Sequence, residues 1–247
     1  MLDISGTEYL TMNRATKMFR RFFSSYHTLL QVSQSTALLL VALCLLSTAI
    51  SAQPRSWERR DSWQNPAGIL QALQVKEGSW IADVGAGEGY LTYHLAIAVG
   101  PQGRVFAEDI SSRSLRSLRS NLPEELVGRV TIIEGRVDSP NLPEGALDGV
   151  VALNAYHEFT EYESMLAHIY ESLKPGGLLV IADRATAADS TRGRRQQTSS
   201  HRLHYAPVRE ELQAAGFEIV SLDPDFAREP GSRSSGTYWL MVARRPD

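Results

Sequence analysis

Cysteine is almost absent from this chain. Among the 247 residues the single cysteine is Cys44, which lies in an N-terminal apolar stretch. One cysteine excludes an internal disulfide and a zinc site built from thiolates. The part of the chain after this stretch therefore has no thiol nucleophile, and cysteine-based catalysis is excluded there.

A large excess of charge of either sign is absent as well. The 25 Lys and Arg residues nearly balance the 28 Asp and Glu residues, which gives a formal net charge of −3. Nothing in this balance favours a polyanionic partner. Arginines cluster at two places without interleaved aromatic residues, so we interpret the clusters as solvated faces and expect no nucleic acid partner. The clustered arginines are Arg113, Arg116, Arg119, Arg192, Arg194 and Arg195.

A short apolar run stands near the N-terminus. Residues 37–46 (ALLLVALCLL) follow several basic residues and precede small residues that end at Ala52. This order is typical of a secretory signal peptide. The run is short for a membrane-spanning helix, which needs about 20 residues, so an uncleaved anchor is the second interpretation. We therefore divide the chain into residues 1–53, a signal peptide or membrane anchor with a basic start, and residues 54–247, one folded domain.

The N-terminal segment also decides the expected location. A signal peptide or anchor predicts an exported or membrane-anchored protein whose segment interacts with the membrane or the export machinery. Met12 and Met18 could each begin the chain instead, and an over-extended gene start would make the protein cytoplasmic. The sequence leaves this choice open.

Apolar strands alternate with helical patterns after residue 66. Ser111 and Thr160 are each expected to cap a helix between two strands. Residues 54–66 are polar and are interpreted as a lead-in segment. The alternation predicts a mostly parallel sheet that is covered by helices on both faces. The five expected parallel strands are Trp80–Val84, Arg104–Ala107, Val130–Glu134, Leu147–Leu153 and Leu178–Ala182.

Two more strands are expected at the end of the chain. Pro207 opens a helix, and Phe217–Leu222 and Thr237–Val242 then have strand patterns. A turn region rich in Pro, Gly and Ser separates these strands, so they are expected to pair antiparallel. The predicted fold is therefore an α/β, three-layer α-β-α arrangement with a mostly parallel seven-stranded sheet and a C-terminal antiparallel hairpin.

A glycine-rich loop follows the first expected strand. Its acidic residue is Asp83, and Gly85, Gly87 and Gly89 follow at a spacing of two. Glycine allows a tight turn and a close approach of a ligand to the backbone, and a helix N-terminus just beyond adds free N–H groups. Tyr90 stands where the dinucleotide fingerprint G-x-G-x-x-G needs its third glycine.

The pattern Asp-x-Gly-x-Gly-x-Gly resembles motif I of class I S-adenosylmethionine (SAM)-dependent methyltransferases. Five parallel strands followed by an antiparallel pair is also the sheet plan of that family, and the resemblance covers roughly residues 57–247. It implies a Rossmann-like methyltransferase fold, SAM as the methyl donor, and transfer to an unidentified small-molecule acceptor.

The resemblance also implies a set of donor-binding residues. Asp83 would order the loop near the methionine part of SAM, beside Gly85, Gly87 and Gly89. Asp109 lies about 20 residues past the loop, where a carboxylate accepts hydrogen bonds from the ribose hydroxyls, and Glu108 is the alternative.

The segment after the third strand departs from the family pattern. Relatives often have Gly-Asp-Ala there, whereas Arg136 follows the glycine in this chain. We transfer the adenine contact to Asp138, and a turn-forming aspartate is the alternative.

The fourth strand is followed by Asn154-Ala155-Tyr156-His157-Glu158-Phe159. This run resembles the aromatic and histidine stretch of small-molecule methyltransferases related to quinone-biosynthesis enzymes. Asn154 is assigned to the donor side, and Tyr156 and His157 are assigned to catalysis on the acceptor side. An imidazole titrates near neutrality, so His157 could take a proton from the acceptor; a histidine that only packs is the alternative.

Histidines 201 and 204 precede the last helix. With His157 and Glu158 they could surround a metal ion, but their spacing matches no dedicated zinc pattern. We therefore predict no metal and favour a role in the substrate pocket.

The function predicted from these residues is SAM-dependent methyl transfer to a small molecule. A non-catalytic SAM-binding protein of the cell envelope would keep the same fold without turnover, and this alternative stays open. A nucleotide-cofactor oxidoreductase is a further alternative, against which the glycine register argues.

Overall fold

The computed structural model describes residues 54–231 and 236–247. The predicted signal or anchor segment, residues 1–53, lies outside the described residues. Among the helices that are described, none combines the length and the apolarity that crossing a membrane requires.

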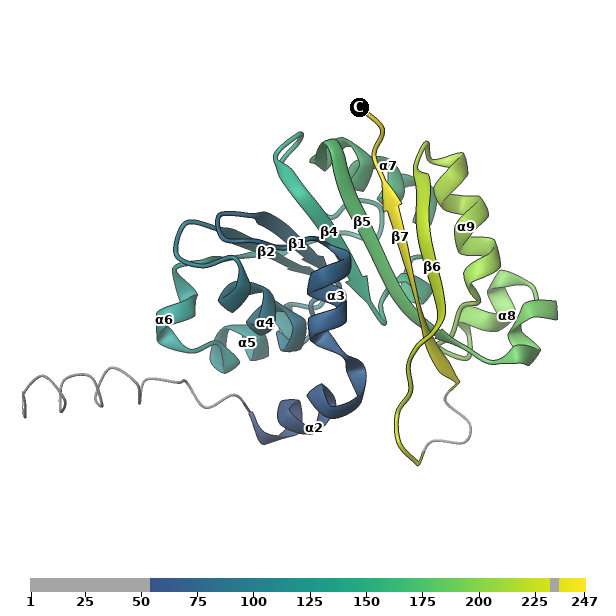
Figure 1. Ribbon diagram of the computed structural model, residues 1–247, viewed down its shortest axis with the longest axis horizontal. Coiled ribbons are helices and arrows are strands. Elements are labelled where there is room, and N and C mark those ends of the chain that lie inside the picture. Colours follow the sequence, from purple (N-terminus) through teal and green to yellow (C-terminus); the bar gives the residue numbers. More distant parts are fainter. Residues whose placement is uncertain (1–53, 232–235) are drawn as a thin grey trace, which may run out of the picture. The chain divides into compact units, whose positions relative to one another are not determined.

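A sheet of seven strands, counted over the described residues, forms the centre of the domain (Figure 1). The spatial order is β3-β2-β1-β4-β5-β7-β6, with the first five strands parallel and β7 antiparallel to both of its neighbours. The predicted mostly parallel sheet with an antiparallel C-terminal pair is therefore confirmed. The strands are β1 (Trp80–Val84), β2 (Arg104–Asp109), β3 (Val130–Glu134), β4 (Leu147–Leu153), β5 (Leu173–Ala185), β6 (Glu218–Ala227) and β7 (Thr237–Arg244).

Helices cover both faces of the sheet and give the predicted three layers (Figure 1). Side chains alternate along a strand, so Leu178 and Val180 of β5 enter one core and Leu179 and Ile181 enter the other. The first core also contains side chains of α3 (Pro66–Ala72) and α4 (Tyr90–Ala98), and α5 (Ser112–Asn121) covers the same face beside them. The second core contains side chains of α7 (Tyr162–Ser172) and α9 (Tyr205–Ala214).

The N-terminal caps that the sequence predicts for α5 and α7 differ in outcome. Ser111 caps α5 as predicted, because its hydroxyl accepts the N–H of Ser114 at 3.2 Å. The predicted cap at Thr160 is wrong: α7 begins at Tyr162 after Glu161 and has no side-chain cap. A short 3₁₀ helix, η1 (Tyr156–Glu158), occupies the preceding residues, so the chain is still turning at Thr160.

The expected lead-in segment forms a helix, α2 (Arg55–Gln64). Trp57 is buried, and its ring lies 6.1 Å from that of Tyr90, the first residue of α4. Asp61 accepts the Tyr90 hydroxyl at 2.9 Å and lies 2.9 Å from Nε2 of His94. A polar helix is thus fixed beside the glycine loop by a few specific contacts.

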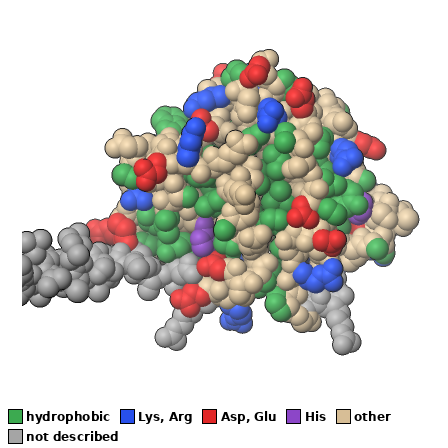
Figure 2. Space-filling view, viewed as in Figure 1, with side chains coloured by type: hydrophobic (Ala, Val, Ile, Leu, Met, Phe, Trp, Pro, Cys, Tyr) green, Lys and Arg blue, Asp and Glu red, His purple; other side chains and the backbone are tan. Residues whose placement is uncertain are grey.

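Charged side chains are mixed on the visible surface. Figure 2 shows acidic and basic groups interspersed over this face, without a broad area of one sign.

Candidate active site

A pocket lies at the carboxyl ends of β1, β2 and β4. The chain runs from β1 to β2 and β3 on one side and continues with β4 on the other, so the topological switch point lies between β1 and β4. We call this the strand-end pocket. Its walls include Gly85, Glu108, Asp109, Ile110, Arg136, Val137, Ala155, Glu158, Phe159, Thr160 and Met165.

The three glycines of the loop have left-handed backbone conformations but different surroundings. The φ angles are +76° at Gly85, +58° at Gly87 and +94° at Gly89. A Cβ at Gly85 would collide with Ala155, and one at Gly89 would lie 2.9 Å from Leu118. A Cβ at Gly87 would meet no heavy atom of the described residues within 4 Å. The outer two glycines therefore permit close packing, whereas Gly87 faces open space.

Asp109 holds the glycine loop against the end of β2. Its Oδ2 accepts the N–H of Gly87 at 2.9 Å, and its Oδ1 accepts the N–H of Ser111 at 2.8 Å. An ionised carboxylate has about four acceptor positions, so both oxygens keep capacity for further donors.

Two buried carboxyl groups lie behind this loop. Burial raises the pKa of Asp83 to about 6, although its Oδ2 accepts the Thr92 hydroxyl at 2.7 Å. Burial also raises the pKa of Glu108 to about 8, and the charges of Asp109 and Asp83 add to this effect. Oε1 of Glu108 has no hydrogen-bond partner among the described residues. A buried acceptor of this kind is costly unless a proton or a ligand satisfies it.

The structure does not bring Asp138 to the strand-end pocket. Its carboxylate pairs with Nε of Arg136 at 3.0 Å, and this hydrogen bond holds the pKa of Asp138 below its ordinary value. Arg136 and Val137 line the pocket instead. The departure of Arg136 from the family pattern was the signal in the sequence that this segment differs.

Asn154 and Tyr156 also lie away from the pocket walls. Asn154 has φ +55°, and its Oδ1 accepts the hydroxyl of Tyr238 on β7 at 3.2 Å. Tyr156 is fully buried and donates its hydroxyl to Glu211 of α9 at 2.7 Å, and burial raises its pKa above the ordinary value. The observed contacts of Tyr156 anchor α9, and its catalytic role stays a prediction.

His157 follows Tyr156 in the short helix η1 and is buried, with 3% of its surface exposed. Its Nδ1 lies 3.0 Å from both carboxylate oxygens of Asp183, which is itself fully buried at the end of β5. Its Nε2 lies 3.6 Å from Oε1 of Glu158. Burial alone would lower the pKa of His157, but the two carboxylates raise it to about 9.

Asp183 is the residue that the sequence analysis missed. It directly follows the apolar run Leu178–Ala182, so the sequence did show a carboxylate after an expected buried strand. Because β4 and β5 are adjacent and parallel, their ends bring His157 and Asp183 together.

A second pocket opens beside the first, between the β4 turn and α8 (Arg194–Thr198). We call it the α8 pocket. It shares Glu158, Phe159 and Thr160 with the strand-end pocket. Its other walls are His157, Tyr162, Arg194, Arg195, Thr198, Ser199 and His201.

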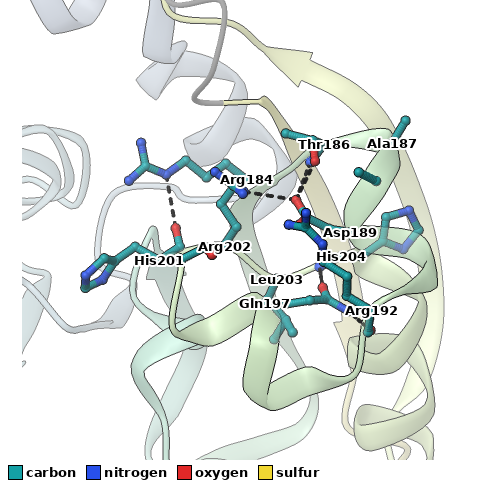
Figure 3. A network of polar contacts seen from close by, with 12 residues as sticks. Arg184, Thr186, Ala187, Asp189, Arg192, Gln197, His201, Arg202, Leu203 and His204 are labelled. Atoms are coloured by element: carbon teal, nitrogen blue, oxygen red, sulfur yellow. Dashed lines mark hydrogen bonds and ion pairs between the residues drawn. The ribbon is translucent and has the colours of Figure 1, made fainter.

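A network around buried Asp189 shapes the segment that carries His201 (Figure 3). Oδ2 of Asp189 accepts the N–H and the hydroxyl of Thr186, each at 2.7 Å, and Nε of Arg202 at 3.0 Å. Oε1 of Gln197 accepts the N–H of His204 at 2.6 Å. These polar contacts hold the segment that carries the outer wall of the α8 pocket.

His204 has a different position from His201. Its Nδ1 accepts the N–H of Ala206 at 3.1 Å and so caps α9. It does not border the α8 pocket, so of the two predicted pocket histidines the structure brings only His201 to His157.

Known proteins are similar to this chain in sequence and in architecture. Residues 81–177 match the family model described as a methyltransferase domain. The demethylmenaquinone methyltransferase of Anoxybacillus flavithermus is 28% identical over 177 residues, which cover 71% of this chain and 73% of that protein. The ubiquinone/menaquinone biosynthesis C-methyltransferase of Yersinia pestis is 30% identical over 110 residues, 44% of each protein.

A solved structure agrees with the fold. The SAM-dependent methyltransferase of Aquifex aeolicus superposes with a TM-score of 0.61 at 21% identity, over 75% of this chain and 91% of that one. The methyltransferase resemblance carried by the glycine motif is thus confirmed, in sequence by the family model and in fold by this structure. Residues 81–177 thus match a methyltransferase domain in sequence, and the described chain has the fold of a class I methyltransferase.

Proposed function

We propose that the domain binds SAM in the strand-end pocket and transfers its methyl group to a small molecule in the α8 pocket. One observation carries this proposal: the two pockets share the turn of Glu158, Phe159 and Thr160 directly after β4. A donor and an acceptor on the two sides of this turn would face each other across it.

The strand-end pocket fits SAM in three respects. Gly87 leaves open space where a ligand can approach the backbone, and Asp109 keeps acceptor capacity for ribose hydroxyls. Oε1 of Glu108 is a further buried polar atom with which a ligand could form a hydrogen bond. When bound, SAM supplies a methyl group that its sulfonium already activates. In this proposal Val137 contacts the adenine ring in place of the predicted Asp138.

The α8 pocket suits a small planar acceptor. Phe159 and Tyr162 provide aromatic walls, and the guanidinium of Arg194 lies 4.3 Å from the centre of the Tyr162 ring. Two of the related proteins are named for methylation in quinone biosynthesis, and quinone precursors are planar rings. Much of the acceleration would come from alignment, with the reacting atoms about 3–3.5 Å apart.

Substitution of His157 tests whether SAM binding and methyl transfer depend on different residues. We expect the full-length His157→Ala variant to bind SAM with wild-type affinity and to lose methyl transfer to hydroxylated quinones by about 10²–10⁴-fold. Isothermal titration calorimetry measures the first, and transfer of a radiolabelled methyl group measures the second. His168→Ala is the control, because His168 is half-exposed on α7 outside both pockets. Equal loss of SAM binding and turnover would place His157 on the donor side. A wild-type protein that binds SAM and methylates no small molecule would favour the non-catalytic alternative.

We also propose that residues 1–53 direct export or membrane anchoring. The support is the apolar run 37–46 with basic residues before it and small residues after it. Mass spectrometry of the native protein separates the two forms. A mature N-terminus near Ala52 supports cleavage, an intact chain in the membrane fraction supports an anchor, and an intact chain in the soluble fraction contradicts both.

A further inference from the structure

Three side chains with metal-binding atoms converge at the wall of the α8 pocket. They are His157, Glu158 and His201, and one ligand atom from each lies within 4.8 Å of the other two. Oε1 of Glu158 is central, at 3.6 Å from Nε2 of His157 and 3.8 Å from Nδ1 of His201. The two imidazole rings meet edge to face, with centroids 5.7 Å apart.

These separations are close to those in a bound metal site. Zinc binds imidazole nitrogen and carboxylate oxygen at about 2.0–2.2 Å, so neighbouring ligand atoms in a tetrahedron lie roughly 3.3–3.6 Å apart. The side chain of His157 is 1% exposed and is fixed, whereas those of Glu158 and His201 are 65% and 69% exposed. Small rotations of the two exposed side chains would complete the geometry around the fixed one.

The buried side of His157 has the support that a metal-binding histidine requires. Asp183 accepts the Nδ1–H, so a metal ion that displaces the Nε2 proton would find the Nε2 lone pair on the side of Glu158 and His201. Asp183 is held in turn, because its carboxylate accepts the N–H of His157 at 2.9 Å and that of Arg184 at 2.8 Å. Carboxylate–histidine pairs of this kind orient the imidazole and raise its basicity toward a metal.

His201 is delivered by a separate part of the fold. It follows α8 with φ +52°, and its carbonyl accepts Nε of Arg184 at 3.2 Å (Figure 3). The network around Asp189 fixes the same segment. Arg184 therefore links the strand end that carries Asp183 to the loop that carries His201. No short spacing in the sequence could indicate this site, because 42 residues lie between Glu158 and His201.

We propose that His157, Glu158 and His201 bind one divalent transition-metal ion, with Zn²⁺ the best match to two imidazoles and one carboxylate. Its remaining coordination position would open into the α8 pocket. In this respect the inference rests on the proposed function: the position would take an oxygen of the methyl acceptor. The acceptor class is then a small planar molecule with a hydroxyl or enol oxygen.

The ion would change how the acceptor is activated. A metal lowers the pKa of a bound hydroxyl, so the O–H proton leaves to solvent before transfer. The oxygen lone pair then forms the new C–O bond, and the electron pair of the broken C–S bond stays on sulfur. His157 would act by holding the ion, because the metal occupies the lone pair that a general base needs.

Metal titration of the full-length protein tests the site directly. The chelator-treated protein is titrated with Zn²⁺ by calorimetry, and with Co²⁺ while its visible absorption is followed. We expect one ion per chain, and at least tenfold weaker binding in each of His201→Ala and Glu158→Gln. Asp183→Asn should weaken binding roughly 10–100-fold by loosening His157. His168→Ala should bind as the wild type does, and thermal melting checks that every variant is folded.

The result separates the metal site from the proposed function. Absence of stoichiometric binding, or binding that is unchanged in both His201→Ala and Glu158→Gln, overturns the metal site. SAM titration of the same samples gives the second arm. A protein that binds SAM but no Zn²⁺ overturns only the metal site, whereas one that binds Zn²⁺ but no SAM overturns only the donor site.

Discussion

Gly87 and Gly145 form a matched pair that tests the glycine loop. Both have φ +58°, and at both a Cβ would meet no heavy atom of the described residues within 4 Å. Gly145 lies in the turn between β3 and β4, outside the strand-end pocket. A valine at either position therefore has similar backbone strain, and only the one at Gly87 occupies the space proposed for SAM.

The expected magnitudes differ for stability and for binding. An L-residue forced into the left-handed region costs about 1–2 kcal/mol, which lowers the melting temperature of a domain of this size by roughly 2–8 °C. Both Gly87→Val and Gly145→Val should show this decrease. Gly87→Val should also weaken SAM by at least about 100-fold, or about 2.7 kcal/mol, because its side chain fills ligand space.

The assay combines thermal unfolding with calorimetric titration of SAM and S-adenosylhomocysteine into the wild type and both variants. We expect Gly145→Val to bind both compounds as the wild type does. Wild-type affinity in a folded Gly87→Val protein would refute the proposed contact between SAM and the loop. An equal loss in Gly145→Val would show that strain alone explains the effect.

Three further predictions follow from the same region and from the N-terminus. Asp109→Ala should weaken SAM by roughly 10–100-fold in the same titration, since it removes a charged acceptor; a loss in Glu108→Ala alone would assign the ribose contact to Glu108. Glu108 has an ordinary pKa of 4.5 and a folded pKa of about 8, so the folded state keeps a proton that the unfolded chain releases between these values. The contribution of Glu108 to stability is thus complete below pH 4.5 and is lost as the pH rises through 8, at up to about 1.4 kcal/mol per pH unit. Urea unfolding from pH 5 to 9 should show this slope. A slope that is unchanged in Glu108→Gln would contradict the assignment. A chain that begins at Pro54 should be soluble and melt cooperatively, since the described cores use residues from 57 onward, and aggregation or a broad transition would show that residues 1–53 pack on the domain.

The central strands could be predicted because local pattern and burial agree there. β1 and β4 are short, mostly buried apolar runs between turn residues, and they match the expected ranges. The edge strand β3 also matches its expected range, although none of its residues is fully buried. β5 is longer than expected, because Leu173 pairs with Leu147 of β4 beyond the apolar run. Local sequence also gave little sign of α2, whose position depends on Trp57 and Asp61 finding partners on α4.

Some residues of the candidate site could likewise be predicted from local sequence, and others could not. The glycine loop and Asp109 follow from spacing along one strand–loop–strand unit, and the structure joins them by a hydrogen bond. Asp183 and His201 reach His157 only through strand order and a long loop, which one sequence does not encode locally. The adenine contact of Asp138 rests on analogy with the family alone, and in the structure the carboxylate of Asp138 accepts a hydrogen bond from the guanidinium of Arg136.

The position of β7 has a consequence for how the protein is made. This strand pairs with β5 along eight registered residues and also holds β6, so it is an inner strand although it is the last along the chain. Its buried residues include Trp239 and Met241. During synthesis β5 has an open edge and β6 has no partner until β7 has left the ribosome. The nascent chain therefore has an unpaired sheet edge while the more than 50 residues between β5 and β7 are translated. Chaperone binding during this time would protect the edge from aggregation.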